Sequence, residues 1–135
     1  MESLVGIVIV SHSAQIAAGT VELARQMAGD DVRIEAAGGT ADGSLGTDAA
    51  AIMAAIAAAD AGAGVLVLVD LGSAVLATQT ALELLGEDAA ARVRISGGPL
   101  VEGAVVAAVQ SSVGDDLAAV LAAAEEAASL PKLSE

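Results

Sequence analysis

Two short, almost wholly apolar runs constrain the fold of this chain more than any other feature. Residues 4–10 read LVGIVIV, and residues 64–70 read GVLVLVD. Runs of this length, rich in β-branched residues and without polar alternation, are typical of strands that are buried on both faces. Such strands occur in parallel sheets covered by helices, so the chain is expected to be an α/β protein.

The segments between and after these runs complete an alternating pattern. Residues 32–36 (VRIEA) alternate apolar and polar side chains, which predicts a half-exposed edge strand, and residues 92–96 (RVRIS) predict another short strand. A long Gly-rich loop is expected at 37–47, of the kind that often carries function. Five helices are expected between the strands and at the end of the chain. The first spans 14–28, the second is capped by Thr47-Asp48 and ends near 59, and the third follows the LGSA turn and ends at 85, before Gly86. The fourth spans 101–112, and the last is capped by Asp115 or Asp116 and ends near 128.

This alternation predicts an α/β, doubly wound, mostly parallel four-stranded sheet that is flanked by helices and joined by right-handed crossovers. The length of 135 residues indicates one domain, placed here at 1–128, with a C-terminal tail at 129–135. In sheets of this kind the ligand site lies at the carboxyl ends of the strands.

Composition excludes several function classes. The net charge is −13, with only five Lys and Arg residues, so binding to nucleic acid or to an anionic membrane surface is not expected. An acidic surface instead favours a basic protein partner. The absence of cysteine removes thiolate chemistry and disulfides. With no signal-peptide pattern and no apolar run long enough for a bilayer, a cytoplasmic location is expected.

Two chemically useful side chains follow the two buried runs. His12, the only histidine, comes two residues after the first run, and Asp70 is the last residue of the second. If these strands are neighbours, the carboxylate can accept a hydrogen bond from one ring nitrogen and leave the other nitrogen oriented as a nucleophile. Backbone amides at 13–15, 47–49 and 72–74, with nearby hydroxyls, could receive an anion. Those hydroxyls belong to Ser11, Ser13, Thr47 and Ser73.

Simpler interpretations of each residue remain open. A histidine after a strand is often a loop or capping residue, and Asp70 could be only a helix N-cap. The glycines could serve turns alone. The loop at 38–46 has neither the P-loop lysine nor GxGxxG spacing, and no GxSxG hydrolase elbow is present. One histidine and no cysteine give no metal-ligand set, so no metal site is expected.

A series of motifs in order then resembles a known family. The motifs that carry the resemblance are, in order, GIVIVSHS, AAGTVELARQM, GTD, VLVLVDLGSAVLATQTALELL and GPLVEGAVVAAVQSSVG. The chain resembles the mannose-type IIA domains of the bacterial phosphoenolpyruvate:sugar phosphotransferase system. The resemblance covers roughly residues 4–128. Among these domains, the motifs most resemble the phosphoryl-donor subunits of phosphoenolpyruvate-dependent dihydroxyacetone kinases.

The resemblance implies a phosphoryl carrier. His12 matches the phosphorylated histidine, which would accept phosphate from the carrier HPr. It would pass the phosphate to ADP held on the subunit DhaL. The resulting ATP would phosphorylate dihydroxyacetone bound to DhaK. Asp70 matches the carboxylate that orients this histidine. Ser13, Gly46, Thr47, Gly72 and Ser73 are expected in loops that contact the phosphate or the site.

The same resemblance implies a homodimer with no cofactor of its own, magnesium and ADP being expected on DhaL. Two alternatives stay open. One is a IIA component that passes phosphate from His12 to a IIB protein for sugar uptake. The other is a regulatory module of the same fold that senses phosphorylation but does not catalyse phosphoryl transfer.

Overall fold

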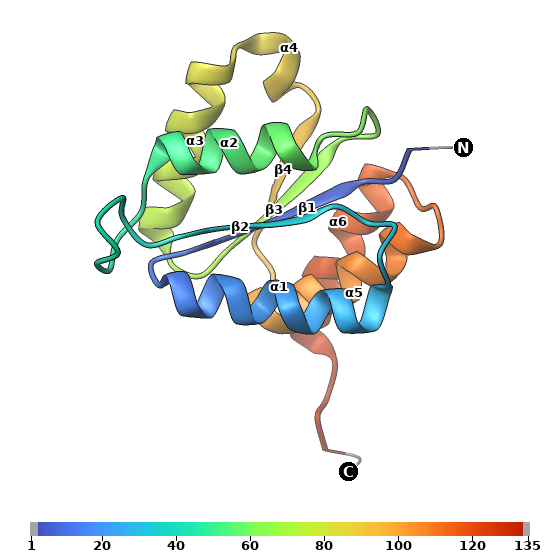
Figure 1. Ribbon diagram of the computed structural model, residues 1–135. Helices are drawn as coiled ribbons and strands as arrows, with labels where there is room; N and C mark the ends of the chain where they lie inside the picture. The colour runs from blue at the N-terminus through green and yellow to red at the C-terminus, as the bar shows by residue number, and fades with distance from the viewer. Residues whose placement is uncertain (1–2, 134–135) are drawn as a thin grey trace.

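The computed structural model describes residues 3–133, which form a four-stranded sheet between two layers of helices (Figure 1). The strand order is β2-β1-β3-β4, and all three neighbouring pairs are parallel. This arrangement confirms the predicted doubly wound sheet. The strands are β1 (Gly6–Ser11), β2 (Ile34–Gly38), β3 (Val65–Val69) and β4 (Val93–Ser96).

Helices cover both faces of this sheet. In Figure 1, α2 and α3 lie on one side of the strands, whereas α1, α5 and α6 lie on the other. The helices of the described chain are α1 (Ala14–Ala28), α2 (Ala49–Ala59), α3 (Gly72–Leu85), α4 (Glu87–Ala90), α5 (Leu100–Ser112) and α6 (Leu117–Glu126), followed by the 3₁₀ turn η1 (Ala127–Ser129).

The apolar runs of the sequence are buried because helices pack on both sides of them. Along β1, Ile7 and Ile9 belong to the core under α1 and α5, whereas Val8 and Val10 belong to the core under α2 and α3. All four side chains are completely buried. The facing helices contribute mainly alanine, whose small side chain lets a helix approach the sheet closely, so the core is filled without any aromatic residue.

The register of the sheet brings the ends of β1 and β3 together. Val10 is paired with Val69, so His12 and Asp70 leave the same edge of the sheet. On the other side of β1, Ser11 is paired with Gly38. A Cβ atom at Gly38 would lie 2.6 Å from the Ser13 carbonyl oxygen, so only glycine lets β2 pass this close to the start of α1.

Several elements differ by a few residues from the sequence predictions, and one short helix was not predicted. β2 begins at Ile34 and extends to Gly38, into the expected loop, because the pairing of Gly38 with Ser11 continues the ladder. The short helix α4 was not predicted, although the acidic residues Glu87 and Asp88 of its first turn suit a helix N-terminus. The last helix ends at Glu126 and tightens into η1.

The end of the described chain contacts the body of the protein. The Lys132 ammonium lies 2.7 Å from the Glu102 carboxylate in the first turn of α5. Residues 134–135 of the expected tail lie outside the described residues, and the domain boundary at 128 stays a prediction. Between residues 3 and 133, no helix is both long enough and apolar enough to cross a membrane.

Candidate functional site

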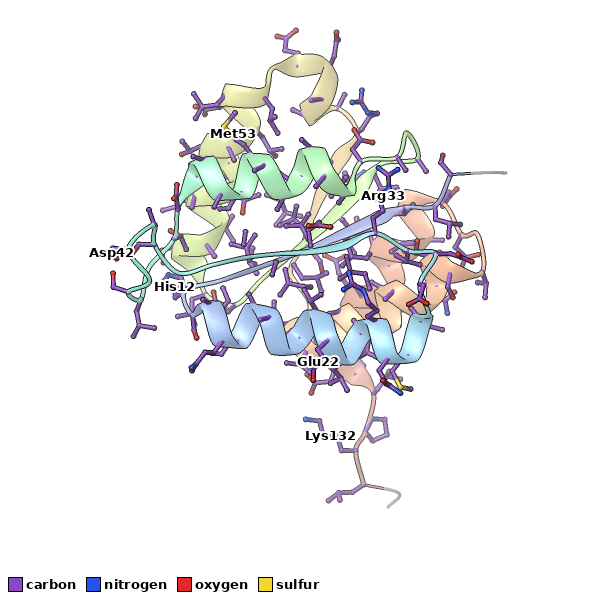
Figure 2. All side chains as sticks on the ribbon, in the orientation of Figure 1. His12, Glu22, Arg33, Asp42, Met53 and Lys132 are labelled. Atoms are coloured by element: carbon purple, nitrogen blue, oxygen red, sulfur yellow. The ribbon has the colours of Figure 1, made fainter. Side chains whose placement is uncertain are left out.

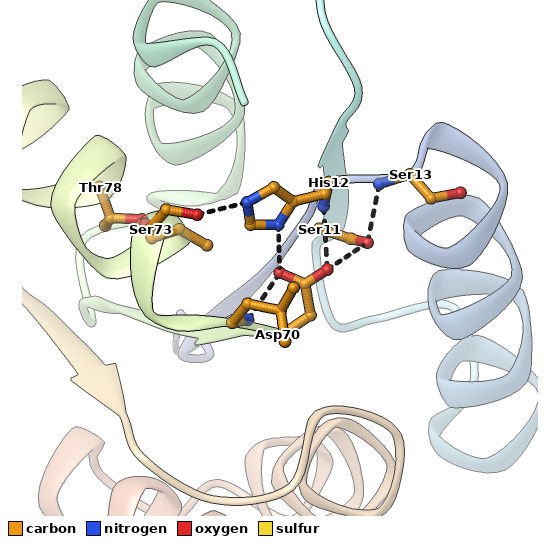
Figure 3. Close-up of polar contacts among 8 residues, drawn as sticks. Ser11, His12, Ser13, Asp70, Ser73 and Thr78 are labelled. Atoms are coloured by element: carbon orange, nitrogen blue, oxygen red, sulfur yellow. Dashed lines mark hydrogen bonds and ion pairs between the residues drawn. The ribbon is translucent and has the colours of Figure 1, made fainter. Parts of the chain in front are cut away.

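His12 is held against Asp70 by two hydrogen bonds at the carboxyl edge of the sheet (Figure 3). The ring Nδ1 lies 2.9 Å from Asp70 Oδ1, and the backbone N–H of His12 donates to Asp70 Oδ2, also at 2.9 Å. His12 directly follows β1 and Asp70 directly follows β3. The predicted meeting of these two residues is therefore confirmed.

The Asp70 carboxylate is surrounded by donors. Oδ1 also accepts from the backbone N–H of Leu71 at 2.8 Å, and Oδ2 also accepts from the Ser11 hydroxyl at 2.9 Å. Burial by itself raises the pKa of Asp70, but the hydrogen bonds from His12, Ser11 and Leu71 outweigh it and hold the pKa below its usual value. The carboxyl is therefore ionised at neutral pH and can only accept hydrogen bonds.

An ionised Asp70 fixes the tautomer of a neutral His12 ring. Because the carboxylate cannot donate, the proton lies on Nδ1 and the lone pair on Nε2. Nε2 is 2.5 Å from Ser73 Oγ, which then donates to it (Figure 3). The His12 side chain is 25% exposed and Ser73 is exposed, so the contact between Nε2 and Ser73 lies at the protein surface, where an incoming protein could displace the hydroxyl.

The start of α3 lies beside this nitrogen. Its N-cap is Leu71, whose side chain makes no capping hydrogen bond, and its first residues are Gly72 and Ser73. Uncapped N–H groups and the positive end of the helix dipole favour an anion at such a position. A Cβ at Gly72 would meet no atom within 4 Å, so the space outside the helix start is open.

The start of α1 is capped within the chain. Ser13 Oγ accepts from the Ile16 N–H at 3.2 Å, which makes Ser13 the N-cap of α1. The Ser13 N–H donates to Ser11 Oγ at 3.0 Å. The expectation that the Ser11 hydroxyl is available to an anion is wrong, because Ser11 is fully buried as the last residue of β1 and its hydroxyl donates to Asp70.

The loop between β2 and α2 is bonded to the backbone of the site at both ends. The Gly39 N–H donates to the Ser11 carbonyl at 3.3 Å, and the Gly46 N–H donates to the His12 carbonyl at 2.8 Å. Gly46 has φ +144°, and a Cβ there would lie 2.7 Å from Thr40 Cγ2, so this contact requires glycine. Gly46 thus lies beside the backbone of His12, while its contact with phosphate stays a prediction.

Asp42 closes the same loop on itself. Its Oδ1 accepts from the Thr40 hydroxyl at 2.5 Å, the Ser44 hydroxyl at 2.6 Å and the Ser44 N–H at 3.1 Å. The hydrogen bonds from Ser44, and then that from Thr40, lower the pKa of Asp42 to about 2. Figure 2 places Asp42 at the same end of the molecule as His12. The sequence does carry a local signal for this closure: Asp42-Gly43-Ser44 is a turn sequence in which the aspartate accepts from the N–H two residues on, although it was not singled out as a site residue.

Two predicted residues stand apart from the hydrogen-bond network. Thr47 is half-buried and precedes Asp48, which caps α2 by accepting from the Ala50 N–H. In the part of the chain that the structure describes, neither Thr47 nor Gly72 makes a hydrogen bond to His12 or Asp70. Their contact with phosphate, like that of Ser13, stays a prediction.

Four of the five basic side chains have contacts away from His12. Arg25 donates to the Ile34 carbonyl, Arg92 pairs with Asp60 at 2.8 Å, and Lys132 pairs with Glu102. Figure 2 shows Arg33 at the opposite end of the molecule from His12. Among residues 3–133, no three His, Cys, Asp or Glu side chains are grouped as metal ligands.

Comparison with known proteins gives a matching family and similar relatives. The EIIA-man family, described as the PTS system fructose IIA component, matches residues 6–121. A protein of Listeria innocua named "PEP-dependent dihydroxyacetone kinase 2, phosphoryl donor subunit DhaM" is 44% identical over 118 residues, which are 87% of this chain and 94% of the relative. The Escherichia coli phosphoryl donor subunit DhaM is 45% identical over 84% of this chain, but the match covers only 25% of that relative.

A solved structure supports the fold over nearly the whole chain. The crystal structure of EF1359, a protein of unknown function, superimposes with a TM-score of 0.81 at 38% identity, covering 93% of this chain and 95% of that one. The match to the family spans β1 through the first half of α6 and includes both His12 and Asp70. The chain belongs to the EIIA-man family of phosphotransferase-system IIA components.

Proposed function

We propose that this chain is a phosphoryl carrier that accepts phosphate on His12 Nε2 from phospho-HPr and passes it to ADP on a DhaL-type subunit. One observation carries the proposal: Nδ1 is bonded to an ionised Asp70, while Nε2 faces the exposed Ser73. The names of the Listeria and Escherichia relatives, phosphoryl donor subunits of dihydroxyacetone kinase, support this acceptor.

In the accepting step, the Nε2 lone pair attacks the phosphorus of phospho-HPr. The N–P bond to the donor breaks as the bond to Nε2 forms, and the donor nitrogen keeps the electron pair. The proton on Nδ1 stays between the ring and Asp70, so the positive charge that develops on the phosphorylated ring faces a carboxylate. The Ser73 hydroxyl, released from Nε2, becomes free to donate to a phosphoryl oxygen.

In the donating step, a terminal oxygen of ADP attacks the phosphorus, and the N–P bond to Nε2 breaks to give ATP and neutral His12. The ring returns to the tautomer that Asp70 holds. The ATP would serve the phosphorylation of dihydroxyacetone on a DhaK-type subunit. Magnesium and ADP are proposed to be bound by the DhaL-type subunit, and this chain is proposed to form a homodimer.

Two further features suit a carrier that meets its partners transiently. The net charge of −13 favours encounter with a basic protein without requiring a tight complex. The uncapped start of α3 offers N–H groups to a phosphoryl group on Nε2 without placing a cation there. A phosphate held by amides and hydroxyls is more easily passed on than one held by lysine or arginine.

The proposal is tested by intact mass after incubation with phosphoenolpyruvate, Enzyme I and HPr, and again after addition of ADP-loaded DhaL. We expect one added phosphate that then leaves as ATP appears. Omission of HPr is the control, and it should give no mass gain.

Other outcomes separate the alternatives. A phosphate that stays on the chain with DhaL, and leaves only when a sugar-specific IIB protein is added, would assign the chain to sugar transport. A wild-type chain that gains no phosphate from phospho-HPr would overturn the carrier function and favour a sensing module.

A further inference from the structure

We propose that Ser11 is a positioning residue for phosphoryl transfer, acting on His12 through Asp70. The inference rests on the proposed function, because it concerns the orientation of the nucleophile that this function requires. No motif in the sequence assigned Ser11 such a role. Its hydroxyl was expected to face an anion, and the structure instead buries it behind the carboxylate.

The direction of the Ser11 hydrogen bonds is determined by its partners. Ser11 Oγ accepts from the Ser13 N–H at 3.0 Å, so its single proton is available for the second contact. That contact is with Asp70 Oδ2 at 2.9 Å, and an ionised carboxylate can only accept. A directed chain therefore runs from the start of α1 through Ser11 to Asp70 (Figure 3).

This chain fixes the rotation of the carboxylate. Oδ2 has two donors, the Ser11 hydroxyl and the His12 backbone N–H, and Oδ1 is thereby turned toward His12 Nδ1. Without Ser11, Oδ2 keeps only the His12 N–H as a donor, and two backbone bonds, from His12 to Oδ2 and from Leu71 to Oδ1, are left to restrain the carboxylate against rotation. The Nδ1–H tautomer then loses part of its preference, and with it the orientation of Nε2.

Ser11 cannot act by touching a partner. It has no exposed surface, so a substitution there leaves the surface around His12 unchanged. An effect of Ser11 on transfer should therefore appear in the rate constant at saturating HPr, not in the concentration of HPr needed for half-maximal rate.

Ser96 provides a matched control. It is the last residue of β4, it is also fully buried, and its Oγ also accepts from the N–H two residues later, that of Gly98 at 3.0 Å. Ser11→Ala and Ser96→Ala thus each remove one buried hydroxyl and one such turn hydrogen bond. Only Ser11→Ala removes a bond to Asp70.

The test uses the full chain labelled with ¹⁵N. Because His12 is the only histidine, its two ring nitrogens give unambiguous signals. We expect the Nδ1–H tautomer to dominate in wild type and in Ser96→Ala, and to lose population in Ser11→Ala. The rate at saturating phospho-HPr should fall roughly tenfold in Ser11→Ala alone, the order expected for one hydrogen bond to a charged group.

The proposal is overturned if Ser11→Ala keeps both the wild-type tautomer ratio and the wild-type transfer rate. It is also overturned if Ser11→Ala and Ser96→Ala lose the transfer rate and the Nδ1–H tautomer to the same extent. If Ser11→Ala does not fold, the tautomer ratio and the transfer rate are measured on Ser11→Cys instead. Its thiol fills the space of the hydroxyl but is a weak hydrogen-bond donor. The tautomer measurement needs no phosphoryl donor. Failure of wild type to accept phosphate would therefore count against the proposed function, while the NMR result would still decide the role of Ser11.

Discussion

His12 and Asp70 are 58 residues apart in the chain and are joined through both oxygens of one carboxylate, Oδ1 to the ring and Oδ2 to the backbone N–H. The double contact holds the backbone and the imidazole of His12 to the same group. A ring held in this way keeps Nε2, the nitrogen that does not contact Asp70, in a fixed direction.

His12→Ala is expected to abolish phosphorylation by phospho-HPr while the fold remains. The ring lies at the surface edge of the sheet and fills no part of either core, so its loss should not unfold the chain. Acid-labile phosphate labelling measures the first effect, and circular dichroism with urea unfolding measures the second. Labelling retained by a folded His12→Ala protein would show that the nucleophile lies elsewhere.

Asp70→Ala should slow phosphoryl transfer strongly without abolishing it. The substitution leaves the nucleophile in place but removes its orientation and the nearby negative charge. Hydrogen bonds to charged groups contribute about 1.5–3 kcal/mol, which corresponds to a loss of roughly ten- to a hundredfold in rate. Single-turnover transfer from phospho-HPr is the measurement, and a wild-type rate would contradict the role given to Asp70.

The pKa of Asp70 predicts a pH dependence of stability. Its pKa is lower in the folded chain than the usual 3.8, so the folded state binds the proton less readily than the unfolded state. The stabilising contribution is therefore complete above about pH 4 and is lost as the pH falls through the lower, folded-state pKa. Asp70→Asn cannot titrate, so the difference in unfolding free energy between wild type and Asp70→Asn should shrink below pH 4.

Urea unfolding of both proteins between pH 7 and pH 3 measures this difference. The comparison isolates Asp70 from the other carboxylates, since those titrate in both proteins. A difference that stays constant over the whole range would mean that Asp70 does not titrate differently in the folded and unfolded states.

The ring and its carboxylate could be predicted from the sequence, because strand ends in a parallel sheet share one edge. His12 and Asp70 each follow a buried apolar run. The prediction had to assume only that these two strands are adjacent in the sheet, as they are. The cap at Asp48 and the stop at Gly86 were predicted for the same local reason, since capping chemistry is encoded within a few residues.

Contacts that depend on side-chain direction could not be predicted in this way. Ser11 is buried because β1 continues one residue further than its apolar run, in register with Gly38. The contact between His12 Nε2 and Ser73 depends on the angle at which α3 leaves β3, which no short motif specifies. The turn at Asp42-Gly43 is recognisable in the sequence, but the contact of Asp42 with the Thr40 and Ser44 hydroxyls depends on the folded loop.

Asp42→Ala is expected to loosen the loop at 39–46 and to reduce transfer through His12. Asp42 Oδ1 holds the hydroxyls of Thr40 and Ser44 and the Ser44 N–H, and this closed loop presents the Gly46 N–H to the His12 carbonyl. Removal of the carboxylate frees all three donors. The Gly46 amide should then exchange with solvent faster, and the transfer rate should fall by a factor of about three to ten, as for one partly compensated hydrogen bond.

Asp30→Ala is the matched control, because Asp30 is also an exposed aspartate and follows α1 at the opposite end of that helix from His12. It removes the same charge without touching the loop. Asp42→Asn keeps an acceptor oxygen and should lie between wild type and Asp42→Ala in both measurements. Equal rates for Asp42→Ala and Asp30→Ala would show that Asp42 contributes only charge, whereas a slower Asp42→Ala with rapid Gly46 exchange would establish that the closed loop supports the backbone of the phosphorylated histidine.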